Sequence, residues 1–314
     1  MNFSPPSLED YLRQEPHPGR LQGGSRIRGE RADPGRGTAP LFTIVTAVYN
    51  QEKDIEKTIL SITGQTFSDY EYVVVDGGSD DGTVEILRKF EECITYWLSE
   101  PDRGIYDAYN KGVAFSSGRW VLFLNADDCL HSPEVLSDAA IYLGQSKAAP
   151  RLMYGTVHEV DGSGKLIRIS GAADSDDFRK WWGMPFQHQG LFTARELFEK
   201  FGLFNHTAFR VLADYDFLMR FCSRGGEKPR FIPVTIATAR RGGISTCLAE
   251  QFRIFRENQT IRKKHELQFF SEGGWKKGLN AFLASCIARA CGELRAARWI
   301  DAYRGMMGKP KRWT

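Results

Sequence analysis

Short hydrophobic runs alternate with amphipathic segments between residues 41 and 124 of the chain. The runs LFTIVTAV, YEYVVVD, ITYWLS and RWVLFLN are rich in β-branched and aromatic residues, which is typical of strands buried on both faces of a sheet. The first run is followed by apolar residues at helical spacing, Ile55, Ile59 and Ile62. Strands that alternate with helices of about ten residues form βαβ units. We therefore predict an α/β fold, with a mostly parallel sheet sandwiched by helices.

The pattern loosens after residue 150. RLMYGTVHEVDGSGKLIRI predicts a hairpin that turns at DGSG, and PRFIPVTIATA predicts a further strand. TARELFEKFG and DYDFLMRFCSRGG predict helices that end at glycine. We expect a mixed extension of the same sheet, and hence one catalytic domain over residues 39–250.

The flanking segments differ from this domain in composition. Residues 1–38 are rich in Gly, Pro and Arg without periodicity, which predicts a disordered leader. Residues 251–314 are predicted to form a basic, amphipathic helical extension, because 276–314 hold nine basic and two acidic side chains. This extension either packs on the domain with a solvated basic face or meets an anionic membrane surface.

Charge and hydropathy argue against a nucleic-acid-binding protein and against a membrane-spanning one. Residues 39–275 carry 27 basic and 32 acidic side chains, so the body lacks the basic face of a nucleic-acid reader. No signal core and no apolar run of about 20 residues appear. We therefore expect a cytoplasmic protein without a nucleic-acid partner, peripheral on the inner face of the cell membrane if its tail binds lipid.

Polar residues gather where the predicted strands end, in Tyr49-Asn50, Asp76–Asp80, Ser99–Arg103 and Asn125–Asp128. In parallel sheets, ligands bind beyond these carboxyl ends. Acids held close together repel one another, and a divalent cation relieves that repulsion. Mg²⁺ or Mn²⁺ commonly takes one or two protein carboxylates, with substrate phosphates completing its shell. The alternative for ADD is a solvated turn before a helix capped by Ser132.

The segments that carry these residues have a family likeness. TIVTAVYNQEKDIEKTILSITGQTFSDYEYVVVDGGSDDGT, SEPDRGIYDAYNKGVAFSSGRWVLFLNADD, HQGLFTARELFEKFGLF, ADYDFLMR and GGIS together resemble the family-two nucleotide-sugar glycosyltransferases. The resemblance covers about residues 41–250 and is nearest to bacterial enzymes of exopolysaccharide, capsule or O-antigen synthesis. It implies the GT-A (Rossmann-like) fold.

The resemblance also implies roles for individual residues. Asp76 would bind the base, and Asp127 would hold the divalent cation (Mn²⁺ or Mg²⁺) with Asp128 beside it as a second metal-site acid. Asn125 stands where the family's DxD motif begins with an acid, so it offers an oxygen without charge. The nucleotide-sugar would contact Thr46, Val48, Asn50, Asp76, Arg103, Lys111, Asn125, Ala126 and His188.

Sugar transfer with inversion needs a carboxylate to accept the proton of the acceptor hydroxyl. Asp214 lies at the family's base position, although it could instead be a helix cap. Ala213 stands where the family often has a second acid. His188 could equally be a structural histidine. Arg240 or Arg241 could balance phosphate charge beside the Gly242-Gly243 loop, or be solvated.

These features together predict a metal-dependent, inverting glycosyltransferase. It would move a sugar from a nucleoside-diphosphate sugar to a saccharide or lipid-linked saccharide acceptor in cell-surface polysaccharide synthesis. The alternatives are a nucleotidyltransferase, a dinucleotide-dependent oxidoreductase or a catalytically idle nucleotide-sugar-binding module. The oxidoreductase is disfavoured because no GxGxxG loop follows the first strand.

Overall fold

The computed structural model describes residues 4–29, 39–143, 150–171, 183–225, 227–267 and 274–306. It divides into two compact units. The first comprises Met1–Phe178 and Met184–Arg240, and the second comprises Arg179–Gly183 and Arg241–Thr314. The first unit thus ends at Arg240, before the predicted boundary at residue 250, because the segment after Arg240 packs with the C-terminal helices.

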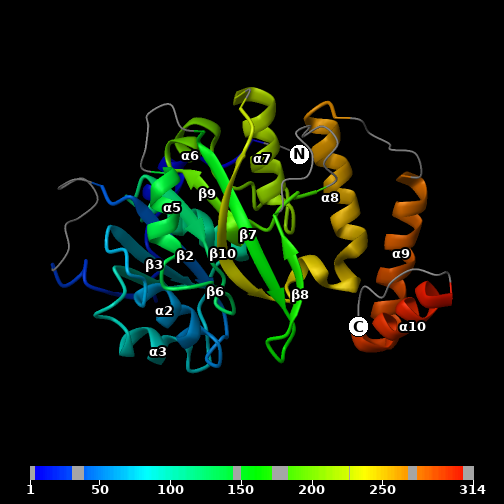
Figure 1. Ribbon diagram of the computed structural model, residues 1–314, viewed down its shortest axis with the longest axis horizontal. Coiled ribbons are helices and arrows are strands. Elements are labelled where there is room, and N and C mark those ends of the chain that lie inside the picture. The colour runs from blue at the N-terminus through cyan, green and yellow to red at the C-terminus, as the bar shows by residue number, and fades with distance from the viewer. Residues whose placement is uncertain are drawn as a thin grey trace. The chain divides into compact units, whose positions relative to one another are not determined.

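One mixed sheet organises the first unit (Figure 1). Its strands are β1 (Leu21–Gly23), β2 (Phe42–Val48), β3 (Tyr70–Asp76), β4 (Tyr96–Ser99), β5 (Trp120–Phe123), β6 (Cys129–Leu130), β7 (Leu152–Val160), β8 (Leu166–Ser170), β9 (Leu191–Ala194) and β10 (Arg230–Arg240). Their order is β1-β4-β3-β2-β5-β9-β7-β10-β6, with β8 paired to β7.

The two halves of the sheet differ in strand direction. Strands β4, β3, β2 and β5 are parallel, as the alternating pattern predicted. Strand β9 runs antiparallel to both β5 and β7, and β10 is parallel to β7. The predicted mixed extension and the hairpin of β7 and β8 are therefore confirmed. The short β9 was not predicted, because its four residues precede a helical pattern without a turn signal.

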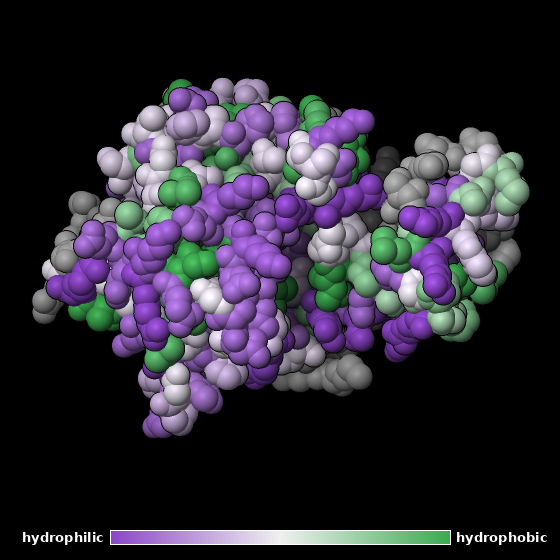
Figure 2. Space-filling view, turned by 90° about the horizontal axis from the view of Figure 1, so that it is seen from below, coloured by the Kyte–Doolittle hydropathy of each residue, from purple (hydrophilic) through white to green (hydrophobic). Residues whose placement is uncertain are grey.

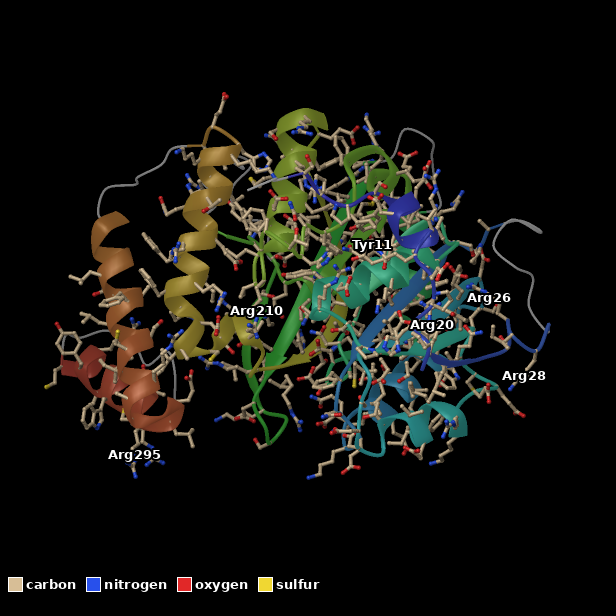
Figure 3. The ribbon with its side chains drawn as sticks, turned by 180° about the vertical axis from the view of Figure 1, so that it is seen from behind. Tyr11, Arg20, Arg26, Arg28, Arg210 and Arg295 are labelled. Atoms are coloured by element: carbon tan, nitrogen blue, oxygen red, sulfur yellow. The ribbon has the colours of Figure 1, made fainter. Side chains whose placement is uncertain are left out.

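Helices cover both faces of this sheet. They are α1 (Leu8–Leu12), α2 (Ile55–Thr63), α3 (Thr83–Lys89), α4 (Ile105–Ala114), α5 (Val135–Leu143), α6 (Glu196–Phe201) and α7 (Ala213–Gly225), with the 3₁₀ turn η2 (His188–Gly190). Helix α4 packs on β2 and β3 and is buried from Tyr106 to Ala114. Figure 1 shows α5 on the near side of the sheet, and Figure 3 shows α4 from the opposite side.

The N-terminal segment differs from the predicted disordered leader. Its described part, residues 4–29, contains α1 against α4 and β1 paired antiparallel with β4. Two arginines from this Arg-rich stretch form ion pairs with buried carboxylates, Arg20 with Glu100 at 2.6 Å and Arg26 with Glu71 at 2.7 Å. Figure 3 marks Tyr11, Arg20 and Arg26 along this segment. Periodicity alone missed it because its order comes from these long-range pairs. Residues 30–38 lie outside the described residues.

The second unit is helical, as predicted. It contains η3 (Ile244–Thr246), η4 (Leu248–Glu250), α8 (Gln251–Lys264), α9 (Gly274–Cys291) and α10 (Glu293–Met306). A small core of Leu248, Ala288, Ala296 and Ala297 joins η4 to the last two helices. None of the described helices is long and apolar enough to cross a bilayer.

Apolar side chains also reach the surface of this unit. On α10, Leu294, Trp299, Tyr303 and Met306 are all more than half exposed. Figure 2 shows hydrophobic and hydrophilic residues interspersed on the surface of α9 and α10, and Figure 3 shows Arg295 projecting outward from α10. The outer surface of α10 is therefore apolar and basic at once.

Candidate active site

The turn Asn125–Asp128 follows β5 and is held from below by Thr58 of α2. The Thr58 hydroxyl oxygen lies 2.8 Å from the Ala126 carbonyl oxygen and 2.7 Å from that of Asp128. The Asp128 N–H donates to the Asn125 carbonyl oxygen at 3.1 Å. These backbone contacts fix the direction in which the two acids of the turn point.

Asp128 is the buried acid of this turn. Its Oδ1 accepts the Arg240 backbone N–H at 3.0 Å, and its Oδ2 accepts Gln189 Nε2 at 2.8 Å and Asn125 Nδ2 at 3.1 Å. Burial and the neighbouring charge of Asp127 raise the pKa of Asp128 to about 7. Both carboxylate oxygens are thus occupied, so Asp128 ties the turn to η2 and β10.

Asn125 completes this network from the other side. The Tyr109 hydroxyl donates to Asn125 Oδ1, which leaves the Asn125 amide nitrogen to donate to Asp128. An aspartate at this position could accept from Tyr109 but could not donate to Asp128. The amide therefore fits the site because its neighbour is already an acid. Ala126 is buried and reaches this network through its carbonyl oxygen.

Asp127 is the half-buried acid that this turn presents. Among the described residues, no other residue donates a hydrogen bond to its carboxylate. Burial and the charge of Asp54 raise the pKa of Asp127, while Arg240 lowers it. Arg240 Nη1 also lies 3.0 Å from Asp54 Oδ1.

Asp127 is the carboxylate of this turn that is open to a metal ion. The described residues contain no group of three or more side chains able to hold a metal ion. One unpaired carboxylate nevertheless suits Mg²⁺ or Mn²⁺ when a diphosphate supplies further oxygens. Asp127 meets this requirement, whereas Asp128 is engaged by internal donors.

Asp214 lies in the first turn of α7, where its Oδ1 accepts the Tyr215 N–H at 2.7 Å. The pKa of Tyr109 is raised well above its usual value by burial, and then by the charges of Asp128, Asp214 and Asp127. The fold thus brings these three acids of the sequence prediction within electrostatic reach of one phenol. Asp216 is fully buried and forms an ion pair with Arg220 at 3.1 Å, which removes it from this group.

His188 packs in an aromatic cluster with Tyr109 and Phe123. Its ring stacks on Tyr109 and Phe123, with centroid separations of 4.9 Å and 5.4 Å. Burial lowers the pKa of His188 to about 4, so the imidazole is neutral at pH 7. Its Nε2 is buried and has no hydrogen-bond partner within the described chain. The neighbouring Gln189, rather than His188, donates a hydrogen bond to Asp128.

The nucleotide side of the candidate site lies at the ends of β2 and β3. Asn50 has a φ of 52° and is clamped by Asp80, whose Oδ1 accepts from Asn50 Nδ2 at 2.8 Å. Thr46 and Val48 are buried, so their side chains pack within the sheet rather than lining an open groove. Tyr49 between Val48 and Asn50 is 60% exposed and is the side chain available for stacking.

Asp76 is fully buried, and its carboxylate accepts hydrogen bonds from the turn that follows it. Its carboxylate accepts from the N–H groups of Gly78 and Ser79, at 3.1 Å and 2.9 Å, and from the hydroxyls of Ser79 and Ser99. Among the described residues, Oδ2 accepts three of these four bonds, whereas Oδ1 accepts only the Ser79 hydroxyl. Oδ1 therefore keeps one acceptor site for the predicted base contact, although the Asp76 side chain is fully buried.

The two predicted cations are placed differently. Lys111 is buried and pairs with Glu100 at 2.9 Å, so it balances an internal acid. Arg103 has an exposed side chain that lies 3.5 Å from Asp107. Of the two, only Arg103 is accessible to a ligand, because the buried Lys111 is held by Glu100.

The sequence prediction places Tyr49 at a strand end without a role of its own, and it does not single out Asp54 and Tyr109. Strand β2 is buried on both faces, so the signal for an exposed Tyr49 was its place just beyond the end of that strand. Tyr109 and Asp54 gave no local signal, because their partners lie in other elements.

Comparison with known proteins shows which family the chain belongs to. Residues 43–201 match the family model described as glycosyl transferase family 2. A PGL/p-HBAD biosynthesis glycosyltransferase of Mycobacterium bovis is 35% identical over 217 residues, which are 68% of this chain and 82% of that protein.

Solved structures share the fold at low identity. The mannosyltransferase PcManGT from Pyrobaculum calidifontis, in complex with GDP-Man and Mn²⁺, has a TM-score of 0.55 at 19% identity. The match covers 95% of this chain and 85% of that one. Staphylococcus aureus TarS 1-349 in complex with UDP has a TM-score of 0.54 at 16% identity, over 83% of this chain and 78% of that one.

Proposed function

Because the chain belongs to glycosyl transferase family 2, we propose that it transfers a sugar from a nucleoside-diphosphate sugar to an acceptor hydroxyl, with inversion at the anomeric carbon. The observation that carries the proposal is the arrangement of Asp127, Asp128 and Asp214 around Tyr109. It offers one carboxylate for a cation and a separate one for a proton, as inverting transfer requires.

The acids divide the work as follows. Asp127 holds a divalent cation, which when bound stabilises the negative charge of the departing diphosphate. Asp128 and Asn125 keep the turn in place through their hydrogen bonds. Asp214 accepts the proton of the acceptor hydroxyl as that oxygen attacks.

The donor side is proposed at the ends of β2 and β3. Tyr49 stacks on the base, Asn50 shapes the turn with Asp80, and Arg103 faces phosphate or ribose. The complexes of TarS with UDP and of PcManGT with GDP-Man and Mn²⁺ support a nucleotide-sugar donor and a divalent cation.

The acceptor is proposed to be a saccharide or lipid-linked saccharide of cell-surface polysaccharide synthesis. The M. bovis relative is named for the biosynthesis of PGL and p-HBAD, which supports a role in building complex glycoconjugates. We further propose that the protein acts at the cytoplasmic membrane face, with α10 on anionic lipid. The exposed Trp299 and Tyr303 beside Arg295 and Arg298 support this placement.

Two substitutions separate the proposed roles of the acids. We expect Asp127→Asn to abolish Mn²⁺-dependent binding of the donor, measured by calorimetry with UDP-GlcNAc, GDP-mannose and related sugars. We expect Asp214→Asn to keep that binding but to reduce sugar transfer by about 10²–10⁴-fold, because only the proton acceptor is lost. Asp138→Asn, at an exposed acid of α5, is the matched control.

Equal loss of donor binding in both variants would contradict this division of roles. Binding without any turnover by the wild-type protein, across donors and acceptors, would favour a nucleotide-sugar-binding module instead.

A further inference from the structure

Arg240 joins two acidic segments of the site. It is the last residue of β10, and its backbone N–H donates to Asp128 Oδ1 at 3.0 Å. Its side chain reaches Asp54, the residue just before α2, with Nη1 3.0 Å from Asp54 Oδ1. The main chain of Arg240 is therefore anchored to the turn, while the acid that its guanidinium contacts in the described part of the chain is Asp54.

That ion pair is accessible to solvent. The side chain of Arg240 is 37% exposed and that of Asp54 is 23% exposed. Ion pairs that are open to solvent contribute little to stability. The guanidinium can thus leave Asp54 at small cost.

The pair also lies beside the proposed metal ligand. Both Asp54 and Arg240 are within electrostatic reach of Asp127, and their charges act on it in opposite directions. Within the described chain, Asp127 has no hydrogen-bond donor besides its own backbone. Arg240 is therefore the cation that offsets Asp54 and Asp127 when no ligand is bound.

We propose that the Arg240 guanidinium exchanges between two partners: Asp54 in the nucleotide-free protein and a phosphate of the bound nucleoside diphosphate. Arginine suits this exchange because its planar fork binds carboxylate and phosphate with the same geometry. The positive charge of Arg240 repels a metal ion that binds alone. A metal–diphosphate complex also carries phosphate oxygens, which can accept hydrogen bonds from the Arg240 guanidinium. Metal and nucleotide binding are thereby coupled. The inference rests on the proposed function and adds a regulatory residue to that site.

The exchange predicts opposite effects of one substitution on two ligands. For Arg240→Gln, we expect Mn²⁺ alone to bind about fivefold tighter, because a nearby positive charge is removed. We expect the same variant to bind UDP or GDP about tenfold more weakly at saturating Mn²⁺, because a charge-assisted contact is lost. Electron paramagnetic resonance of free Mn²⁺ measures the first constant, and calorimetry measures the second.

Two further variants complete the design. Asp54→Asn should weaken Mn²⁺ binding about fivefold while nucleotide binding stays at least as tight as in the wild type, because the guanidinium is released. Arg13→Gln breaks an exposed ion pair within α1 and is the matched control, with both constants unchanged. The anchor of Arg240 is a backbone N–H, so Arg240→Gln should keep the wild-type melting temperature.

The inference is overturned if Arg240→Gln weakens the binding of both Mn²⁺ and nucleotide, because a residue with a purely structural role would have that effect. It is also overturned if the substitution changes neither binding constant. The metal titration needs no nucleotide, so it tests the exchange even if the wild-type protein binds no nucleotide. Absence of nucleotide binding in the wild type would count against the proposed function instead.

Discussion

Asn125 carries an amide where the resemblance to family-two enzymes leads one to expect an acid. Its oxygen accepts from Tyr109 and its nitrogen donates to Asp128, so both ends of the amide are used. A carboxylate here would lie about 3 Å from the buried carboxylate of Asp128 and would repel it. The neutral amide of Asn125 thus accompanies the buried acid Asp128, which lies three residues later in the same turn.

This geometry predicts that restoring the acid is harmful. Asn125→Asp should lower the free energy of unfolding by about 1–3 kcal/mol at neutral pH, because a donor is lost and a like charge is gained. Urea denaturation followed by circular dichroism measures the change. Tyr109→Phe removes only the hydroxyl and should cost about 1 kcal/mol.

Unchanged stability of Asn125→Asp together with tighter Mn²⁺ binding would contradict this account. It would make position 125 a metal-ligand site that has lost its acid.

At the scale of elements, the N-terminal segment and α4 form one structure. Strand β1 extends the sheet beside β4, and Tyr11 of α1 donates to Asp107 of α4 at 2.5 Å. Glu100 lies where these parts meet and pairs with Arg20 at 2.6 Å and Lys111 at 2.9 Å. Because α4 also carries Tyr109, the N-terminal segment supports the helix whose Tyr109 hydroxyl donates to Asn125 in the Asn125–Asp128 turn.

The Glu100 pairs predict a dependence of stability on pH. Burial opposes ionisation of Glu100, but hydrogen bonds and charge from Arg20 and Lys111 outweigh it and lower its pKa from 4.5 to about 2. A depressed pKa stabilises the folded state above the unfolded-state value, and this contribution is lost as pH falls from 4.5 towards 2.

We expect the wild-type protein to lose about 2 kcal/mol through this group over that range, after allowance for solvent screening. Glu100→Gln should remove this part of the pH dependence and be less stable at neutral pH. Glu9→Gln, at an exposed acid of α1 paired with Arg13, is the control. Equal acid sensitivity of Glu100→Gln and the wild type would show that the pairs contribute nothing.

At the scale of the whole molecule, the chain separates a mildly acidic body from a basic helical end. Residues 39–275 carry more acidic than basic side chains, whereas 276–314 hold nine basic and two acidic ones. On α10, the exposed Trp299, Tyr303 and Met306 lie at helical spacing on one face. Aromatic and basic residues together are typical of interfacial helices.

This surface predicts binding to anionic vesicles. Arg295→Gln with Arg298→Gln should weaken co-sedimentation with phosphatidylglycerol vesicles by about 30-fold, since each basic residue near such a surface contributes about 1 kcal/mol. Trp299→Ala should weaken it further, and Arg13→Gln should not. Equal binding to neutral phosphatidylcholine, or none by the wild type, would contradict the proposed membrane contact.

The sequence by itself determined the parallel half of the sheet and the family. Strands β2, β3, β4 and β5 are continuous apolar runs, and hydrophobic burial on both faces specifies such runs locally. It also located the polar strand ends with Asp127 and Asp128, because ligand sites in these folds follow the strand ends. Asp214, in the first turn of α7, was indicated by the family resemblance alone.

Tertiary structure decided what each of these side chains does. Asp127 and Asp128 are adjacent in sequence, but only Asp128 meets donors from η2 and β10, 61 and 112 residues away. Asp76 and Lys111 likewise contact partners inside the protein, Asp76 the N–H of Ser79 and Lys111 the carboxylate of Glu100. The order of residues 4–29 likewise depends on carboxylates of the distant β3 and β4 region. Hydropathy records which residues are buried, whereas hydrogen bonds and ion pairs between distant segments exist only once the chain has folded.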